Sequence, residues 1–244
     1  MNSYVSIDLE TTGLNPGRDK IIEIGAVKVL DGERAGTFSS LVNPGRKLEP
    51  GITELTGIRE EDLRDAPYIE DLLEGVLDFL GDLPLLGHSI LFDYSFLKKA
   101  AVNAKKTFEK QAVDTLKIAR KYLPELESRS LEYLCRYYHI THQAHRALTD
   151  AEATLVLYDR LKEQFYSRED SLFCPSALVF KVKRDQPATK QQKEKLYFLT
   201  ARHKIVLDVE IERLTRSEAS RLTDLILSRS AKIHRGIFPE DSEE

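Results

Sequence analysis

Residues 4–13 are YVSIDLETTG, and this stretch decides the fold of the first part of the chain. Residues 4–9 alternate and then run apolar, as a buried strand does, and the turn-forming residues 12–17 follow at once. Side chains two residues apart on a strand point to the same face of its sheet. We therefore expect the carboxylates of Asp8 and Glu10 to stand side by side at the end of an opening strand.

Paired carboxylates are costly unless something neutralises them. Two like charges about 4 Å apart repel by roughly 4 kcal/mol at an effective dielectric of about 20. A divalent cation between Asp8 and Glu10 would convert this repulsion into binding, and carboxylate oxygens suit hard cations such as Mg²⁺ or Mn²⁺. An isolated pair of this kind also occurs on solvated strand faces, so it indicates a metal site only together with further ligands.

The pattern up to about residue 168 is that of an α/β domain. Residues 21–30, 37–42 and 83–86 are predicted strands, with a hairpin turn at residues 31–32 between the first two. Apolar residues at helical spacing predict helices over residues 67–80, 92–103, 115–122, 130–138 and 150–165. Strands that alternate with helices indicate a layered domain with a central sheet.

The composition is that of a soluble globular protein. The 244 residues are 41% hydrophobic and 31% charged, enough for one good core and an appendage. No stretch approaches the roughly 18 apolar residues of a membrane span, and the acidic beginning is unlike a signal peptide. We expect a cytoplasmic protein with no membrane partner. Cys135 and Cys174 form no C-x-x-C pair, so neither a disulfide framework nor a zinc site is expected.

The C-terminal part has a different character. Residues 169–187 contain two prolines and no helical pattern, which predicts a linker. Capping-box patterns begin at Thr189 and Thr215, and each predicts the start of a short helix. We expect a small helical module over residues 188–236, followed by an acidic tail at residues 237–244.

Charge is distributed unevenly along the chain. Residues 1–170 hold 22 Lys and Arg against 29 Asp and Glu, whereas residues 171–235 hold 14 against 7. The basic segment suggests an arm that attracts phosphate groups. A solvated helical surface explains the same charge.

A second polar group follows the strand predicted at residues 83–86. Asp93 lies where a glycine-terminated strand gives way to a turn and a helix, and α/β proteins usually place ligand sites at such strand ends. A carboxylate near a helix N-terminus also satisfies free N–H groups and favours the helix dipole. Taken alone, Asp93 is better explained as a helix cap.

A third group is formed by His145 and Asp150. Five residues on a helix correspond to about 140° of rotation, so the two side chains cannot share a helical face. We expect His145 on the loop before the helix and Asp150 in its early turns, where both can reach one pocket. A neutral imidazole is suited to take a proton from water. The spacing of His139, His142 and His145 also permits a soft-metal cluster, but no thiol or carboxylate completes it nearby.

Taken in order, these motifs resemble the three exonuclease motifs of the DEDDh family. They are Asp8 to Gly13, then Phe92 with Asp93, then His145 with Asp150 five residues later. The resemblance is closest to proofreading subunits and domains of bacterial replicative polymerases and covers about residues 1–168. It implies an α/β, ribonuclease H-like fold, with a central mixed five-stranded sheet flanked by helices, followed by the small C-terminal helical module.

The resemblance also implies phosphodiester hydrolysis with two divalent ions, Mg²⁺ or Mn²⁺. In such a site Asp8 would bridge both ions. Glu10 and Asp150 would bind chiefly the ion on the side of the nucleophile, and Asp93 the other ion, partly through water. His145 would be the general base.

Substrate contacts are implied by the same resemblance. The residues expected to touch the terminal nucleotide are Thr11, Thr12, Gly13, Leu14, Ile52, Leu55, His88, Ser89 and Phe92, with Leu14 as a wedge or stacking surface. Ser89 departs from the family pattern, since relatives commonly carry Asn there. Ser can donate a hydrogen bond but reaches less far.

The function expected from these features is removal of nucleotides from single-stranded DNA 3′ ends, with release of nucleoside monophosphates. Expected partners are single-stranded nucleic acid, DNA rather than RNA, and a DNA polymerase or another replication or repair protein. The same residues serve exoribonucleases that trim RNA 3′ ends, because discrimination by the 2′-hydroxyl is not visible in these motifs. A catalytically inactive domain that only binds nucleic acid or a polymerase is the alternative from another class.

Overall fold

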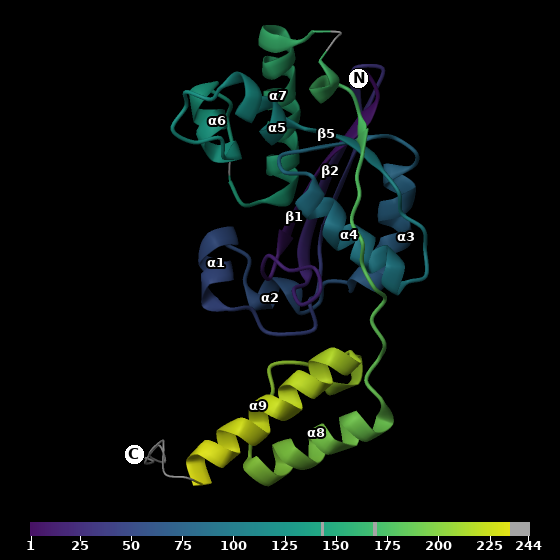
Figure 1. Cartoon of the computed structure of the whole chain (residues 1–244), viewed down its shortest axis with the longest axis vertical. Coiled ribbons are helices and arrows are strands. Elements are labelled where there is room, and N and C mark those ends of the chain that lie inside the picture. The colour runs from purple at the N-terminus through teal and green to yellow at the C-terminus, as the bar shows by residue number, and fades with distance from the viewer. Residues whose placement is uncertain (143, 168–169, 235–244) are drawn as a thin grey trace. The chain divides into compact units, whose positions relative to one another are not determined.

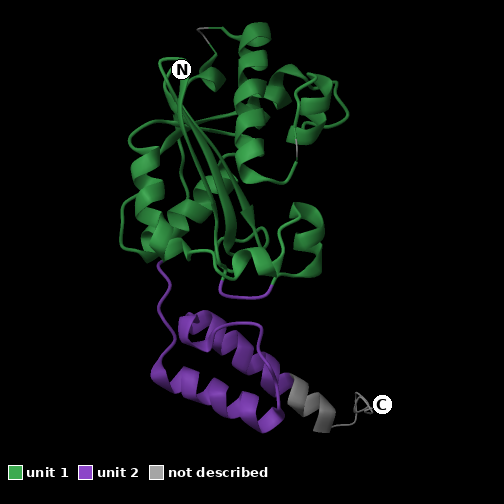
Figure 2. Cartoon of the chain, turned by 180° about the vertical axis from the view of Figure 1, so that it is seen from behind, with its two compact units in different colours: residues 1–44, 48–183 green, residues 45–47, 184–244 purple. Residues whose placement is uncertain are grey.

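A computed structural model of the chain describes residues 1–142, 144–167 and 170–234, so the predicted acidic tail 237–244 lies outside the described residues. The chain divides into two compact units (Figure 2). Unit 1 comprises Met1–Pro44 and Leu48–Lys183, and unit 2 comprises Gly45–Lys47 and Arg184–Glu244.

Unit 1 opens with three antiparallel strands (Figure 1). They are β1 (Tyr4–Thr11), β2 (Ile21–Leu30) and β3 (Glu33–Leu41). The turn between β2 and β3 has φ values of 52° at Asp31 and 89° at Gly32. Two successive positive φ values belong to the tight hairpin turn that an Asp-Gly pair favours, so the predicted hairpin is confirmed.

The rest of unit 1 alternates helices with short strands, as predicted. The elements are α1 (Pro50–Thr56), α2 (Glu60–Leu63), α3 (Ile69–Leu80), β4 (Leu85–Gly87), α4 (Leu91–Asn103), β5 (Gln111–Asp114), α5 (Thr115–Tyr122), α6 (Leu131–Tyr137), α7 (Ala147–Phe165), η1 (Ser171–Phe173) and β6 (Ser176–Ala177). Helices α1 and α2 and strand β5 were not among the elements predicted from apolar periodicity, because each is too short to show a clear period.

The sheet has the order β3-β2-β1-β4-β5-β6. Strand β4 runs parallel to β1 and to β5, whereas β6 is antiparallel to β5. The mixed α/β sheet is confirmed, but over the described residues it has six strands rather than five. The sixth is β6, which lies inside the segment 169–187 that was predicted to be a linker. Its two residues carry no strand pattern and are held by backbone pairing with Gln111 and Ala112.

Alternation along β1 builds a core on each face of the sheet. Val5, Ile7 and Leu9 are buried in a cluster that includes residues of α3 and α4. Tyr4 is buried in a second cluster with residues of α5, α6 and α7. The sheet is therefore covered by helices on both faces, and its second face carries α7 directly against β1 and β2 (Figure 1).

Unit 2 is built from two helices, α8 (Lys190–His203) and α9 (Arg216–His234), with a short 3₁₀ turn, η2 (Ile211–Arg213), between them. Both predicted capping boxes are present. The Thr189 and Gln192 side chains cap α8 reciprocally, and Thr215 and Glu218 do the same for α9. The two helices enclose a small apolar core formed by Ala188, Leu196, Leu199, Leu214, Ala219 and Ile226.

Within the described residues, none of the helices combines the length and the apolar character that crossing a bilayer requires.

Candidate metal centre

Strand β1 presents Asp8 and Glu10 on the face that α7 covers. Ser6, two residues before Asp8, donates its hydroxyl hydrogen to the carbonyl of Ala151 at 2.7 Å, which ties this face of β1 to α7. Asp150 lies in the first turn of α7 and is 7% exposed. One carboxylate oxygen from each of Asp8, Glu10 and Asp150 lies within 4.8 Å of the other two. The strand alternation thus produces the predicted pair, and α7 adds the third acid.

Asp93 reaches the same region from the first turn of α4. It is 3% exposed, and its Oδ1 accepts the backbone N–H of Leu9 at 3.0 Å. The N-cap of α4 is Ile90, and its side chain makes no capping hydrogen bond. The Asp93 carboxylate accepts its own backbone N–H in the first turn of α4 as well as the N–H of Leu9, so it joins α4 to β1. Its charge also acts on Asp8, whose pKa it raises.

Electrostatics make this cluster unfavourable without a cation. Burial, followed by the charges of Asp93, Asp150 and Glu10, raises the pKa of Asp8 well above its usual range. Burial and the nearby Asp150 raise the pKa of Glu10 to about 7. Burial likewise raises the pKa of Asp93. Asp8, Glu10 and Asp93, whose pKa values are raised, form with Asp150 a set of hard oxygen donors, which fits divalent cations such as Mg²⁺ or Mn²⁺.

Because the pKa of Glu10 rises from 4.5 to about 7 on folding, metal-free protein is expected to lose stability with increasing pH. The folded state binds the Glu10 proton more tightly than the unfolded state does. The stabilisation that this proton provides is therefore complete below about pH 4.5 and is lost as the pH passes 7. The loss is on the order of 3 kcal/mol. Urea unfolding in EDTA at acid and slightly alkaline pH measures it.

Two controls separate the Glu10 effect from general acid titration. Glu10→Gln should flatten the pH dependence in EDTA, and excess Mg²⁺ should do the same for the unaltered chain because it stabilises the ionised carboxylates. Identical pH profiles for the unaltered chain and Glu10→Gln would contradict the assignment.

The loop before α7 holds a histidine against the cluster, but it is His142. The His142 Nε2 lies 2.7 Å from Asp150 Oδ1, and its side chain is 5% exposed. His145 lies on the same loop, as predicted, with a φ of 65° in the left-handed region. Among the described residues, no hydrogen bond or ion pair joins His145 to the four carboxylates. The described residues also contain no cluster of three histidines that could hold a metal, so the soft-metal cluster considered for His139, His142 and His145 is not formed.

The end of β4 is held by a second polar network. His88 contacts Thr115 Oγ1 through Nδ1 at 2.9 Å and the Arg129 carbonyl through Nε2 at 2.8 Å. Burial lowers the pKa of His88. The backbone N–H of Ser89 donates to Asp114 Oδ1 at 3.0 Å. Both ring nitrogens of His88 therefore contact the protein itself, and these contacts hold the end of β4 in place.

Ser89, which stands where relatives commonly carry Asn, has an unusual backbone conformation. Ser89 is exposed and has a φ of 70°, a left-handed value that Asn adopts more readily than Ser. We expect Ser89→Asn to raise the free energy of unfolding by about 0.5–1 kcal/mol, measured by urea denaturation. Ser89→Ala is the matched control and should give no gain. A destabilised Asn variant would show that the backbone geometry does not set the preference.

The turn after β1 carries the first predicted substrate contacts. The Thr11 hydroxyl donates to the Gly13 carbonyl at 2.7 Å, and Thr12 Oγ1 accepts the Lys20 N–H at 2.9 Å. Leu14 is 84% exposed at the tip of this turn. The threonines thus order the turn, and Leu14 offers an exposed apolar surface on it.

The remaining predicted contacts come from α1 and α4. Leu55 is 52% exposed, whereas Ile52 is partly buried in a small cluster with Ile22, Leu48 and other residues. Phe92 is partly buried against the sheet core, and its ring lies 5.0 Å from that of Phe96.

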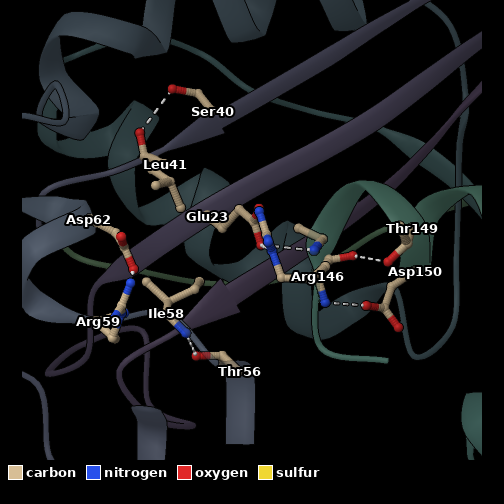
Figure 3. A network of polar contacts seen from close by, with 11 residues as sticks. Glu23, Ser40, Leu41, Thr56, Ile58, Arg59, Asp62, Arg146, Thr149 and Asp150 are labelled. Carbon is tan, nitrogen blue, oxygen red and sulfur yellow. Dashed lines mark hydrogen bonds and ion pairs between the residues drawn. The ribbon is translucent and has the colours of Figure 1, made fainter. Parts of the chain in front are cut away.

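Sequence reasoning overlooked Glu23, which lies on β2 and is 2% exposed. Its Oε2 accepts the Ala147 N–H at 3.0 Å, and its carboxylate pairs with Arg146 (Figure 3). The available signal was an acid in the middle of an Ile- and Val-rich strand, where a charge is buried only with partners.

The sequence profile of the RNase T exonuclease family matches residues 5–158 of this chain. The chain belongs to the RNase T exonuclease family. The resemblance to the DEDDh exonucleases is thereby confirmed. All four carboxylates and His145 lie inside the matched residues.

Curated proteins that resemble the chain include the PolC-type DNA polymerase III of Clostridium perfringens (strain 13 / Type A). It is 36% identical over 168 residues, which are 67% of this chain and 12% of that protein. The PolC-type polymerase of Bacillus subtilis (strain 168) is 40% identical over 161 residues, 64% of this chain and 11% of that protein. The chain therefore spans about an eighth of the length of these relatives.

Solved structures agree with this family assignment. Exonuclease X in complex with 5′ overhanging duplex DNA is 27% identical, with a TM-score of 0.55, over 68% of this chain and 95% of that chain. Exonuclease I of E. coli, in complex with a 5cy-dA13 oligonucleotide, is 18% identical with a TM-score of 0.59, over 68% of this chain and 41% of that chain, and shows the fold alone. Divalent metals are typical of the family, which agrees with the carboxylate cluster.

Proposed function

We propose that this chain is a metal-dependent 3′→5′ exonuclease that removes nucleoside monophosphates from single-stranded DNA ends. The observation that carries the proposal is the gathering of Asp8, Glu10 and Asp150 oxygens within 4.8 Å of one another, while Asp93 on α4 accepts the N–H of Leu9 on β1. A domain that only binds nucleic acid has no need of acids that repel one another. The family membership supports hydrolysis of phosphodiester bonds.

Asp8, Glu10, Asp93 and Asp150 would hold two divalent cations, Mg²⁺ or Mn²⁺. When bound, the ions supply electrostatic stabilisation of both the attacking and the leaving oxygen of the phosphodiester. His145 takes the proton from the attacking water, and it lies on the loop before α7, five residues before Asp150 in the chain. The leaving 3′ oxygen remains on the shortened strand.

The terminal nucleotide is held by the turn after β1 and by α1. Leu14 and Leu55, 84% and 52% exposed, supply apolar surface for the bases. The turn that carries Leu14 is ordered by Thr11 and Thr12. The DNA substrate is supported by the DNA-bound states of exonucleases X and I and by the resemblance to polymerase components. A DNA polymerase or another replication or repair protein is the partner that this resemblance suggests.

Digestion of a 5′-labelled single-stranded DNA oligomer tests the function. With Mg²⁺ or Mn²⁺ we expect a ladder that shortens from the 3′ end, and with EDTA we expect none. A 3′-labelled oligomer should release its label as a mononucleotide at the first turnover, which distinguishes exonuclease from endonuclease action.

A matching RNA oligomer sets the substrate class. Degradation of RNA with intact DNA would establish the exoribonuclease reading instead. If both oligomers stay intact with both metals, fluorescence anisotropy with labelled DNA decides whether the chain is a binding module.

Unit 2 is proposed to hold nucleic acid through α8. Lys195, Phe198 and Arg202 are exposed at helical spacing, with Phe198 61% exposed and the Arg202 guanidinium 6.0 Å from its ring centroid. Bases stack on aromatic rings and phosphates pair with cations. Lys195→Gln/Arg202→Gln is expected to weaken single-stranded DNA binding and to reduce the salt slope by about 1.4. Anisotropy titrations at several salt concentrations measure both.

The matched control removes two cations from the surface of unit 1. In Arg136→Gln/Arg160→Gln, two side chains that are 70% and 51% exposed lose their charge. If this control weakens binding as much as the α8 variant, unit 2 has no special role and the effect is one of net charge.

A further inference from the structure

Glu23 is a buried acid, and both of its carboxylate oxygens accept hydrogen bonds from residues at the start of α7. Its Oε1 accepts from Arg146 Nη2 at 2.9 Å and from Nε at 3.2 Å, and its Oε2 accepts the Ala147 N–H at 3.0 Å. Figure 3 shows Glu23 on β2 facing Arg146 at the end of the loop that precedes α7. We call Glu23, Arg146 and Ala147 the Glu23 clamp. Bonds to a charged group in a low-dielectric site are stronger than neutral ones.

The clamp holds the chain directly after His145. His145 has a φ of 65°, and a residue other than glycine in this region costs roughly 1–2 kcal/mol. Such strain persists only where the surrounding structure over-determines the conformation. Here the Arg146 side chain and the Ala147 N–H bind Glu23, and the Arg146 N–H donates to Asp150 Oδ2 at 2.8 Å. The backbone between the two motif residues, His145 and Asp150, is therefore fixed at three points.

Gly25 allows α7 to approach β2 this closely. Glu23 and Gly25 are two residues apart on β2, so they face the same way. A Cβ at Gly25 would lie 2.1 Å from the backbone C of Ala147 and from the backbone N of Leu148. The first turn of α7 thus rests directly on β2, with Glu23 at one end of the contact.

The clamp also balances charge beside the metal ligands. Glu10 and Glu23 are direct partners across β1 and β2. Like charges in such positions repel. The Arg146 guanidinium lies on Glu23 and is 47% exposed, and it counteracts the effect of Glu23 on Glu10. Because three donors already occupy it, Glu23 is not available as a further ligand.

We infer that Glu23 is a positioning residue that, through Arg146 and Ala147, fixes His145 and Asp150 relative to Asp8 and Glu10. This inference rests on the proposed exonuclease function. Glu23 does not touch substrate or metal. It acts by holding the loop that carries the proton acceptor and the helix that carries the third carboxylate.

Glu23→Gln in the full chain tests the clamp, because Gln keeps the shape but loses the charge that binds Arg146. With single-stranded DNA and saturating Mg²⁺, kcat is expected to fall about 10–100-fold with little change in KM, as is usual when a residue that orients metal ligands is altered. Arg146→Lys, which keeps a cation for Glu23, should retain more of kcat than Glu23→Gln. An unchanged kcat in Glu23→Gln would overturn the inference.

Two readouts do not require activity. Amide hydrogen exchange should accelerate by about tenfold or more at residues 146–150 in Glu23→Gln while the core strands stay protected. Calorimetry without DNA should show weaker Mn²⁺ binding by Glu23→Gln, because Asp150 is less well placed in this variant. If the unaltered chain cuts no nucleic acid, the proposed function fails, yet exchange and Mn²⁺ binding still decide the clamp.

The matched control is Glu152→Gln. Glu152 also lies on α7 and pairs with a strand cation, Arg34, at 3.1 Å, but its side chain is 37% exposed. This variant should keep the kcat, exchange pattern and Mn²⁺ affinity of the unaltered chain. If exchange in Glu23→Gln rises uniformly across the core strands, Glu23 serves only global stability, and the positioning role is overturned.

Discussion

Asp8→Asn is expected to abolish metal-dependent cleavage and, at the same time, to raise the melting temperature of the metal-free protein. Asp8 stands at the centre of the acidic cluster, where burial and four neighbouring acids raise its pKa. Asparagine keeps the size but removes the charge that a divalent cation requires. The loss of activity should be about 10³-fold or more, since removing a single preorganised group already costs that much.

Stability should change in the opposite direction. At slightly alkaline pH in EDTA, the unaltered chain must either ionise Asp8 beside its neighbours or hold a proton against the solvent. Each kcal/mol regained should raise the melting temperature by roughly 2–4 °C in a protein of this size. Calorimetry with and without EDTA and Mg²⁺ measures the effect.

The effect of Mg²⁺ on the stability of each protein provides the control. Mg²⁺ should stabilise the unaltered chain and have a much smaller effect on Asp8→Asn, because binding to the folded state alone raises stability. An Asn variant that cleaves DNA at the normal rate, or that melts lower in EDTA, would contradict the assignment of Asp8 to a metal site.

His145→Asn is expected to lower kcat about 10²–10⁴-fold, the usual contribution of a general base. Asn suits this position because His145 has a φ of 65°, which Asn tolerates and Ala does not. The loss therefore reports the imidazole and not backbone strain. Single-turnover cleavage of labelled DNA across a range of pH measures it.

The same substitution at the neighbouring histidines ranks their roles. His142→Asn removes the 2.7 Å contact with Asp150 and should cost less in kcat than His145→Asn. His139→Asn is the control, since His139 is exposed with a φ of 54° and should be dispensable. If His142→Asn causes the larger loss, the proton acceptor is His142.

Local sequence patterns predicted much of the site because two pairs of its residues lie close together in the sequence. Asp8 and Glu10 share a face through the two-residue period of a strand, and the spacing of His145 and Asp150 places one on a loop and one on a helix. Asp93 had two explanations in the sequence. The structure supports the explanation as part of the carboxylate site, because the Leu9 N–H on β1 donates a hydrogen bond to the Asp93 carboxylate.

For other features, the local sequence did not indicate the contact partner. Strand β6 is held only by its partner β5, so its two residues were predicted as linker. His142 was considered only as part of a soft-metal cluster, since nothing in the spacing indicates that its ring meets Asp150. Glu23 lies more than a hundred residues from Arg146, and its role depends on a contact that only folding creates.

The sequence by itself determined the α/β class, the pairing of carboxylates on the first strand, the order of the motifs and the capped helices of the C-terminal module. These depend on periodicities of two and 3.6 residues and on side chains that bond to their own neighbourhood. Tertiary structure alone decided that Asp93 binds β1, that His142 meets Asp150 and that Glu23 holds the loop of His145. Such contacts join residues distant in sequence, and their geometry is set by how α7 packs on the sheet.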